Sequence, residues 1–176
     1  MTWGPYLEHQ RQTGLYGQDQ IAWGGLRLTL SGRQDWVRPT DFTTVQHDRK
    51  FTWRVGRLYL TSFSVAPYVS YSTSIEPHVG NVLHADGSVT GANPSEGKQI
   101  EAGLKYQLPG THILVTAVWF RIEQTNLLTG VPGTGFSTQS GKMRSQGFEA
   151  EAIVPLPYGF AAKAAFSHQR VTTCTA

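Results

Sequence analysis

Apolar and polar side chains alternate along segment after segment of this chain, and few stretches show the three-and-four spacing of a helix. Between Gln99 and Tyr106, for example, every second residue is apolar and the residues between them are Gln, Glu, Gly and Lys. A period of two is typical of a half-buried β-strand. Such segments predict eight strands, at Gln12 to Ile21, Leu26 to Arg33, Phe51 to Leu60, Pro67 to Thr73, Gln99 to Tyr106, Ile113 to Gln124, Gly147 to Ala152 and Phe160 to Ser167. The chain is therefore expected to be all-β.

The connections between these strands alternate in length. Short turns are expected at Trp23 to Gly25, Thr61 to Ala66, Leu108 to Thr111 and Pro155 to Gly159, and long loops at Asp35 to Lys50, Ser74 to Gly97 and Thr125 to Lys142. Outer-membrane barrels have short periplasmic turns at one end and longer external loops at the other. A β-sandwich has no reason to sort its loops in this way. The pattern favours an antiparallel up-and-down meander of an outer-membrane barrel.

Composition agrees with this prediction. Only 15% of the residues are charged, against about 25% in soluble domains, and uncharged Thr, Ser and Gln replace the missing charge. No stretch approaches the roughly 20 apolar residues of a membrane helix, which excludes a helical membrane protein. A transmembrane barrel needs only about ten alternating residues in each strand, so a barrel stays possible.

Aromatic residues gather where the predicted strands end. Four lie near the short turns, namely Trp23, Tyr59, Tyr106 and Tyr158, and three near the long loops, namely Trp36, Tyr71 and Phe136. Outer-membrane strands carry aromatic rings at both headgroup levels. The placement fits two such aromatic girdles, although aromatic residues are common at the ends of strands in general.

Several classes of function find no support in the sequence. The net charge of +3 is spread without a basic run, so no nucleic-acid partner is expected. The single cysteine, Cys174, excludes an internal disulfide, and the six histidines lack the spacing of a metal site. Glu149 and Glu151 share a strand face as catalytic carboxylates can, but on a barrel that face is the wet lumen, where Glu101 and Lys105 also point and where charge is expected without catalysis. We expect no enzyme, no metal and no cofactor.

Seven short motifs follow one another at consistent spacing. They are QTGLYGQDQI from Gln12, LSGRQD from Leu30, FTWRVG from Phe51, APYVSYS from Ala66, GKQIEAGLKY from Gly97, QTNLLT from Gln124 and GKMRSQGFEAE from Gly141. In this order they resemble motifs of TonB-dependent siderophore receptors, such as "TGLYxQDQI" and "APYVSYSxSF". The resemblance covers nearly the whole chain, from Gln12 to about Val171.

The resemblance implies both a fold and a function. Members of this family form a 22-stranded outer-membrane barrel around a plug and import ferric siderophores with energy from TonB. Eight strands make up about a third of such a barrel, so residues 1–176 are expected to be a partial barrel, a curved sheet not closed on itself, without the plug or the TonB box. Such a piece alone is not expected to transport. Its expected partners are a ferric siderophore, the TonB complex through the missing regions, and outer-membrane lipid.

Two positions depart from the family pattern. Gly17 stands where an apolar residue is usual, and Arg57 falls on the expected lipid face. An arginine facing lipid costs about 2 to 4 kcal/mol at mid-bilayer and much less near an interface. Arg57 precedes the turn-side Tyr59 by two residues, so its side chain is expected to reach toward the headgroups.

Candidate ligand contacts follow from the expected topology. Aromatic rings and hydrogen-bond donors near the outer opening could bind a bulky iron chelate, which selects Trp36, Tyr71, His78 and Phe136. Each also has a plain interpretation as girdle or loop packing. Two other architectures stay open: a self-contained eight-stranded outer-membrane barrel with an adhesive, enzymatic or structural role, and a soluble β-sandwich binding module.

Overall fold

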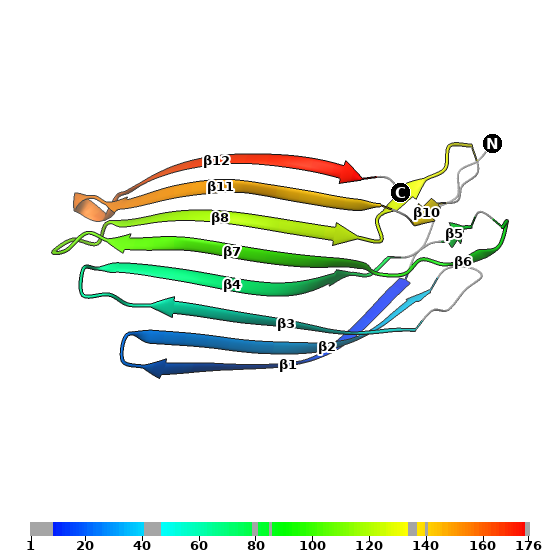
Figure 1. The fold of residues 1–176 in the computed structure, drawn as a ribbon, viewed down its shortest axis with the longest axis horizontal. Helices are drawn as coiled ribbons and strands as arrows, with labels where there is room; N and C mark the ends of the chain where they lie inside the picture. The colour runs from blue at the N-terminus through cyan, green and yellow to red at the C-terminus, as the bar shows by residue number, and fades with distance from the viewer. Residues whose placement is uncertain are drawn as a thin grey trace.

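The computed structural model describes residues 9–40, 47–78, 81–84, 86–133, 137–139 and 141–174. Eight long strands lie side by side in one antiparallel sheet, each next to its neighbour in the chain apart from the short loop strands (Figure 1). Their bounds are β1 (His9–Trp23), β2 (Leu26–Thr40), β3 (Asp48–Tyr59), β4 (Val65–Glu76), β7 (Ser95–Gln107), β8 (Leu114–Thr125), β11 (Lys142–Pro155) and β12 (Ala161–Cys174). All eight predicted strands are present in the predicted order.

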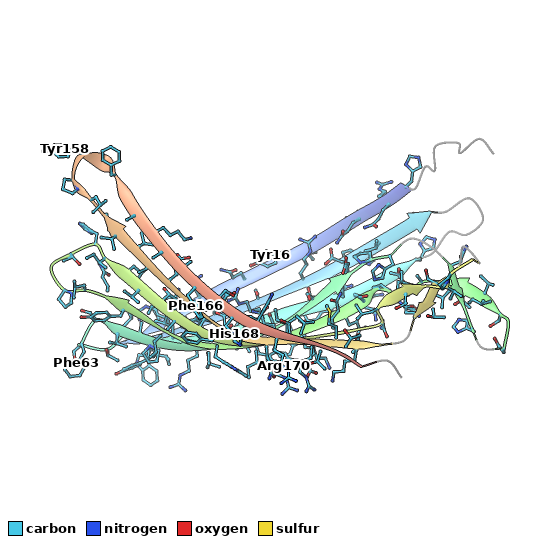
Figure 2. The ribbon with its side chains drawn as sticks, turned by 90° about the horizontal axis from the view of Figure 1, so that it is seen from above. Tyr16, Phe63, Tyr158, Phe166, His168 and Arg170 are labelled. Atoms are coloured by element: carbon cyan, nitrogen blue, oxygen red, sulfur yellow. The ribbon has the colours of Figure 1, made fainter. Side chains whose placement is uncertain are left out.

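The sheet is curved and open. Strands β1 and β12 form its two edges, and the described residues contain no pairing between them (Figure 2). A self-contained eight-stranded barrel would have to pair these strands, so that alternative is wrong. Among the described residues the other sheet has four strands of three residues each, so no second layer of comparable size covers the large sheet, and the β-sandwich is wrong as well. The prediction of an unclosed sheet is confirmed.

Strand register defines two faces of the sheet. Directly opposed residues in neighbouring strands place their side chains on the same face, and one such row contains Leu28, Arg57 and Val69. On the convex face defined by this row, large apolar side chains are exposed, namely Leu15, Ile21, Leu30, Phe51, Trp53, Val69, Ile100, Leu104, Val115, Trp119, Phe148 and Phe166. Arg57 lies among them, as predicted. The opposite, concave face carries mostly polar side chains.

A second, smaller sheet forms at the end of the molecule opposite the short turns. It contains β5 (Asn81–Leu83), β6 (Val89–Gly91), β9 (Leu128–Gly130) and β10 (Ser137–Gln139), in the order β6-β5-β10-β9. These strands belong to two different long connections, and β5 and β10 pair in parallel at Val82 and Ser137. Strands of three residues are too short to show a period of two, so this sheet could not be predicted.

The first long loop is shorter than predicted. Strands β2 and β3 continue past the expected loop boundaries at Asp35 and Lys50, and Val37 pairs with Asp48. Val37 is 1% exposed. Asp35 and Arg38 lie close to this valine in the sequence. Their charges suggested a loop, so the continuation of both strands was not predicted.

At the opposite end of the sheet, tight turns join neighbouring strands, as predicted. β1 and β2 are joined by Gly24 and Gly25 alone, and Gly24 has a φ of +54°. Glycine adopts this conformation without strain, which is why two-residue hairpins favour it. A 3-10 turn, η1 (Pro157–Gly159), joins β11 to β12. No helix among the described residues is long and apolar enough to cross a membrane.

Candidate functional site

The concave face holds a polar hollow of about 540 Å³ over β1, β2, β3, β4 and β7. We call its charged and phenolic residues the concave patch: Arg27, Arg54, Tyr68, Glu101 and Lys105. Each comes from the alternate positions of its strand that face away from the convex apolar surface. The alternation of side chains between the two faces of each strand therefore accounts for the patch.

Glu101 is held by two hydrogen bonds. The Tyr68 hydroxyl donates to Oε1 of Glu101 at 2.7 Å, and Nε2 of Gln99 donates to Oε2 at 3.1 Å. The Lys105 ammonium lies 5.4 Å from the centre of the Tyr68 ring, within cation-π range. These contacts fix the carboxylate and the phenol in place on the wall of the hollow.

A glycine makes room for the Tyr68 ring. Gly103 pairs with Tyr68 across β4 and β7. A Cβ atom at Gly103 would lie 2.7 Å from Cε1 of the ring and 2.6 Å from the carbonyl oxygen of Ala117. Both separations are shorter than van der Waals contact, so only glycine fits between the ring and β8.

A second polar network lies on the concave face nearer the long loops. Asp35 is 2% exposed and accepts hydrogen bonds from Nε of Arg33 at 2.8 and 2.9 Å and from Nε2 of Gln12 at 2.9 Å. This network joins β1 to β2. Because a buried carboxylate is costly unless paired, these donors explain how Asp35 can be buried.

The concave face can bind polar partners. It offers three cations, a carboxylate and a phenol around one open hollow. The alternation between Gln99 and Tyr106 is enough to assign Glu101 and Lys105 to the polar face of their strand. Tyr68 and Arg54 were not predicted, although the alternation of β3 and β4 already distinguished them from the convex-face positions. Within the described ranges, no three His, Cys, Asp or Glu side chains gather as a metal site.

Two predicted ligand contacts lie on the convex face. The Tyr71 ring packs against the Trp53 ring, with centroids 5.1 Å apart and planes inclined by 35°. Trp36 is 42% exposed and borders a hollow of about 500 Å³ with the cations Arg38 and Arg49. Both positions match an aromatic girdle near the long loops.

The other two candidates belong to the long connections. Nε2 of His78 lies 2.6 Å from Oγ of Ser95, and that hydroxyl donates to the carbonyl oxygen of Asn126 at 2.8 Å. His78 therefore packs at the base of the small sheet. Phe136 lies outside the described residues. The structure does not bring Trp36, Tyr71 and His78 together.

Gln139 links the two long connections. Its Nε2 donates to the carbonyl oxygens of Asn93 and, at 3.0 Å, of Asn126, while its Oε1 accepts from the backbone N–H of Asn93 at 2.9 Å. Asp86, in the turn between β5 and β6, accepts from the hydroxyl and the N–H of Ser88. These hydrogen bonds lower the pKa of the Asp86 carboxyl. The small sheet is thus fixed by side chains as well as by its strands.

Known proteins are similar to this chain in sequence and in fold. The family described as TonB dependent receptor-like, beta-barrel matches residues 4–174. The ferrichrome outer membrane transporter/phage receptor of Escherichia coli is 41% identical over 162 residues, which cover 87% of this chain and 21% of that protein. The ferrioxamine B receptor of Salmonella typhimurium is 37% identical over 164 residues, covering 90% of this chain and 23% of the relative.

Solved structures agree on the fold. The ferripyoverdine receptor of the outer membrane of Pseudomonas aeruginosa superposes with a TM-score of 0.81 at 21% identity, over 94% of this chain and 23% of that one. The chain therefore spans less than a quarter of the length of these relatives. The family match covers nearly all of the chain, and the relatives are receptors of the outer membrane. The chain belongs to the TonB-dependent receptor family and forms eight antiparallel strands of an outer-membrane β-barrel.

Proposed function

We propose that these strands form part of the wall of a receptor that imports ferric siderophores across the outer membrane. The observation that carries the proposal is the open, curved sheet with a polar concave face and an apolar convex face. In a large barrel the concave face lines the lumen and the convex face meets lipid. The names of the two relatives above, a ferrichrome transporter and a ferrioxamine B receptor, support a siderophore as the ligand.

The unpaired edges support a larger barrel. Unpaired backbone N–H and C=O groups cost several kcal/mol each in hydrocarbon, so β1 and β12 need neighbouring strands to be stable in a membrane. Gating and the contact with TonB belong, in this proposal, to other parts of the receptor. The eight strands alone do not transport, and the chain catalyses no reaction.

Ligand contact takes place at the end with the long connections, which faces the exterior. His78 is a candidate contact there, and Phe136, which lies outside the described residues, stays a prediction from the sequence. The convex position of Trp36 and Tyr71 supports their interpretation as girdle residues. The concave patch lies deeper, on the wall that a ligand passes after it has left the outer opening.

Uptake of labelled iron tests the proposal. A strain that lacks its own siderophore receptors would express the receptor carrying this chain and be offered radioactive iron bound to ferrichrome or to ferrioxamine B. We expect uptake of at least one of the two, abolished when TonB is deleted. Uptake that continues without TonB would contradict the proposal, as would failure to take up either chelate when the receptor is present in the outer membrane.

A further inference from the structure

One arginine of the concave face is held in a fixed position by buried neighbours. Both hydrogen bonds from Arg33 to the Asp35 carboxylate come from Nε, at 2.8 and 2.9 Å. Asp35 is 2% exposed, and Nε2 of Gln12 donates to the same carboxylate at 2.9 Å. A buried acceptor that has its own partner cannot swing with the arginine. The guanidinium is therefore oriented before any ligand arrives.

A glycine makes room for this guanidinium. Gly14 pairs with Asp35 across β1 and β2. A Cβ atom at Gly14 would lie 2.5 Å from Nη2 of Arg33 and 2.8 Å from its Cζ. The guanidinium thus packs against the β1 backbone at the one residue type that admits it. The Arg33 side chain is still 46% exposed, so it is fixed by the wall and also reaches the lumen.

An exposed aromatic ring lies beside Arg33. Tyr16 pairs with Arg33 across β1 and β2, so the two side chains share the concave face. Tyr16 is 55% exposed and lies within the curve of the sheet (Figure 2). Its hydroxyl donates to Oε1 of Gln18, which anchors the ring at its polar end. The ring therefore offers an apolar contact next to a fixed cation.

The balance of charge indicates the kind of ligand that fits. Arg33 and Asp35 together carry no net charge, and Lys50, which is opposite Asp35 on β3, pairs with Glu96 at 2.6 Å. The carboxylate is buried, so the exposed groups are the guanidinium and the Tyr16 ring. Oxygen atoms bound to Fe³⁺ are electron-rich acceptors, and arginine offers paired N–H donors for two neighbouring oxygens. An iron chelate with oxygen ligands and apolar linking chains suits both groups.

Arg33 lies between the outer opening and the concave hollow. Ser31, two residues nearer the short turns, lines the hollow, as does Tyr16. Two residues span about 6 to 7 Å along a strand. On the other side of Arg33, β2 and β3 stay paired as far as Val37 and Asp48. A ligand that moves from the long connections toward the hollow therefore passes this position.

We propose that Arg33 and Tyr16 form a contact site for the ferric chelate on the barrel wall. Arg33 donates to the iron-bound oxygens, the Tyr16 ring packs against the carbon chains of the chelate, and Asp35 is the positioning residue. The site rests on the proposed function, and the two fail differently. A receptor that binds no ferric chelate contradicts both, whereas an Arg33 variant that binds the chelate as tightly as the unchanged receptor contradicts the site alone.

Chelate titration tests the site. Ferrichrome or ferrioxamine B, whichever supports uptake, would be titrated into the purified whole receptor and followed by quenching of tryptophan fluorescence. We expect Arg33→Gln to weaken binding about tenfold, the contribution of a hydrogen bond from a charged donor. Arg33→Lys keeps the charge without the planar donors and should recover only part of the affinity. Tyr16→Ala should cost about threefold, and it makes the comparison if the Arg33 variants fail to insert.

Arg57→Gln is the matched control. Arg57 is an arginine of the same sheet, but it lies on the convex face and cannot reach a ligand in the lumen. We expect this variant to bind the chelate as the unchanged receptor does. An equal loss in Arg57→Gln, or unchanged affinity in both Arg33→Gln and Tyr16→Ala, would overturn the proposal.

Asp35→Asn separates positioning from folding. This variant keeps the size of the side chain but leaves the Arg33 charge without its balancing anion. We expect it to shift the ratio of affinities toward a derivative of the same chelate that bears an added carboxylate, by up to about fivefold, the size of an exposed ion pair. Damage to the fold would lower both affinities alike. An unchanged ratio would overturn the role of Asp35 and, with it, the proposed site.

Discussion

The Tyr68 hydroxyl donates a hydrogen bond to Oε1 of Glu101 at 2.7 Å, and this contact joins β4 to β7 on the wall of the polar hollow. Tyr68→Phe removes the donor and leaves Glu101 with Gln99 as its remaining neutral partner. A hydrogen bond to a charged group contributes about 1.5 to 3 kcal/mol. We expect the free energy of unfolding, measured by urea titration in lipid vesicles, to fall by about that amount or somewhat less, because the hollow is open to water.

Tyr106→Phe is the control for that measurement. Tyr106 lies near the short turns, and its hydroxyl makes no hydrogen bond to the described residues. Its removal should leave the free energy of unfolding unchanged. If the two variants unfold alike, the bond between Tyr68 and Glu101 does not stabilise the barrel.

Gly103→Ala should disturb the sheet far more than its size suggests. The added Cβ atom would lie 2.6 Å from the Ala117 carbonyl oxygen and 2.7 Å from the Tyr68 ring. Overpacking of this kind typically costs about 1 to 3 kcal/mol. Gly17→Ala, whose Cβ meets no atom within 4 Å, should be neutral or slightly stabilising. The fraction of heat-resistant folded receptor on an electrophoresis gel would compare the two, and equal losses would count against the close approach at Gly103.

Asp35→Ala removes the shared acceptor of Arg33 and Gln12. Arg33 is partly exposed, so water can solvate its guanidinium, and we expect a loss of about 1 to 3 kcal/mol rather than the larger cost of a fully buried orphan charge. Asp19→Ala is the matched control, because Asp19 is exposed and accepts only from the N–H of its neighbour Gln20. Urea titration of both variants would give the comparison. An equal effect at the two sites would show that the Asp35 network contributes nothing specific.

Gln139→Ala should loosen both long connections at once. Its side chain is bonded to Asn93 in one connection and to Asn126 in the other. Limited proteolysis of the receptor in membranes should cut the variant faster within both 77–94 and 126–141. Gln18→Ala, on β1 far from the small sheet, should be cut at the unchanged rate. Faster cutting of one connection alone would show that Gln139 does not couple them.

The sequence was sufficient for the large sheet because each long strand holds enough residues to show its period. Gln99 to Tyr106 is the clearest case, and the structure pairs all of it with both neighbours. The extension of β2 through Val37 was hidden by the charged residues around it. The small sheet could not be predicted for another reason. Val82 and Ser137 are far apart in the sequence, and no local pattern indicates that they pair.

The polar site was only half predictable. Glu101 and Lys105 follow from alternation on a single strand. Their relation to Tyr68 and Arg54 needed the register between β3, β4 and β7, which is set by turns and pairing across the whole sheet. The ion pairs of Glu123 with Lys142 and Arg144 depend on register in the same way. A period assigns each side chain to a face, but only register decides which side chains are neighbours.

The parallel pairing of β5 with β10 limits how this receptor can diverge. Because Val82 in one connection pairs with Ser137 in the other, an insertion or deletion in one connection changes the strand with which the other can pair. The two segments therefore cannot change length independently as most surface loops do. Natural variants should instead exchange both segments together, as a single inherited unit, and a chimaera that combines one segment from each of two parents should display a disordered outer opening.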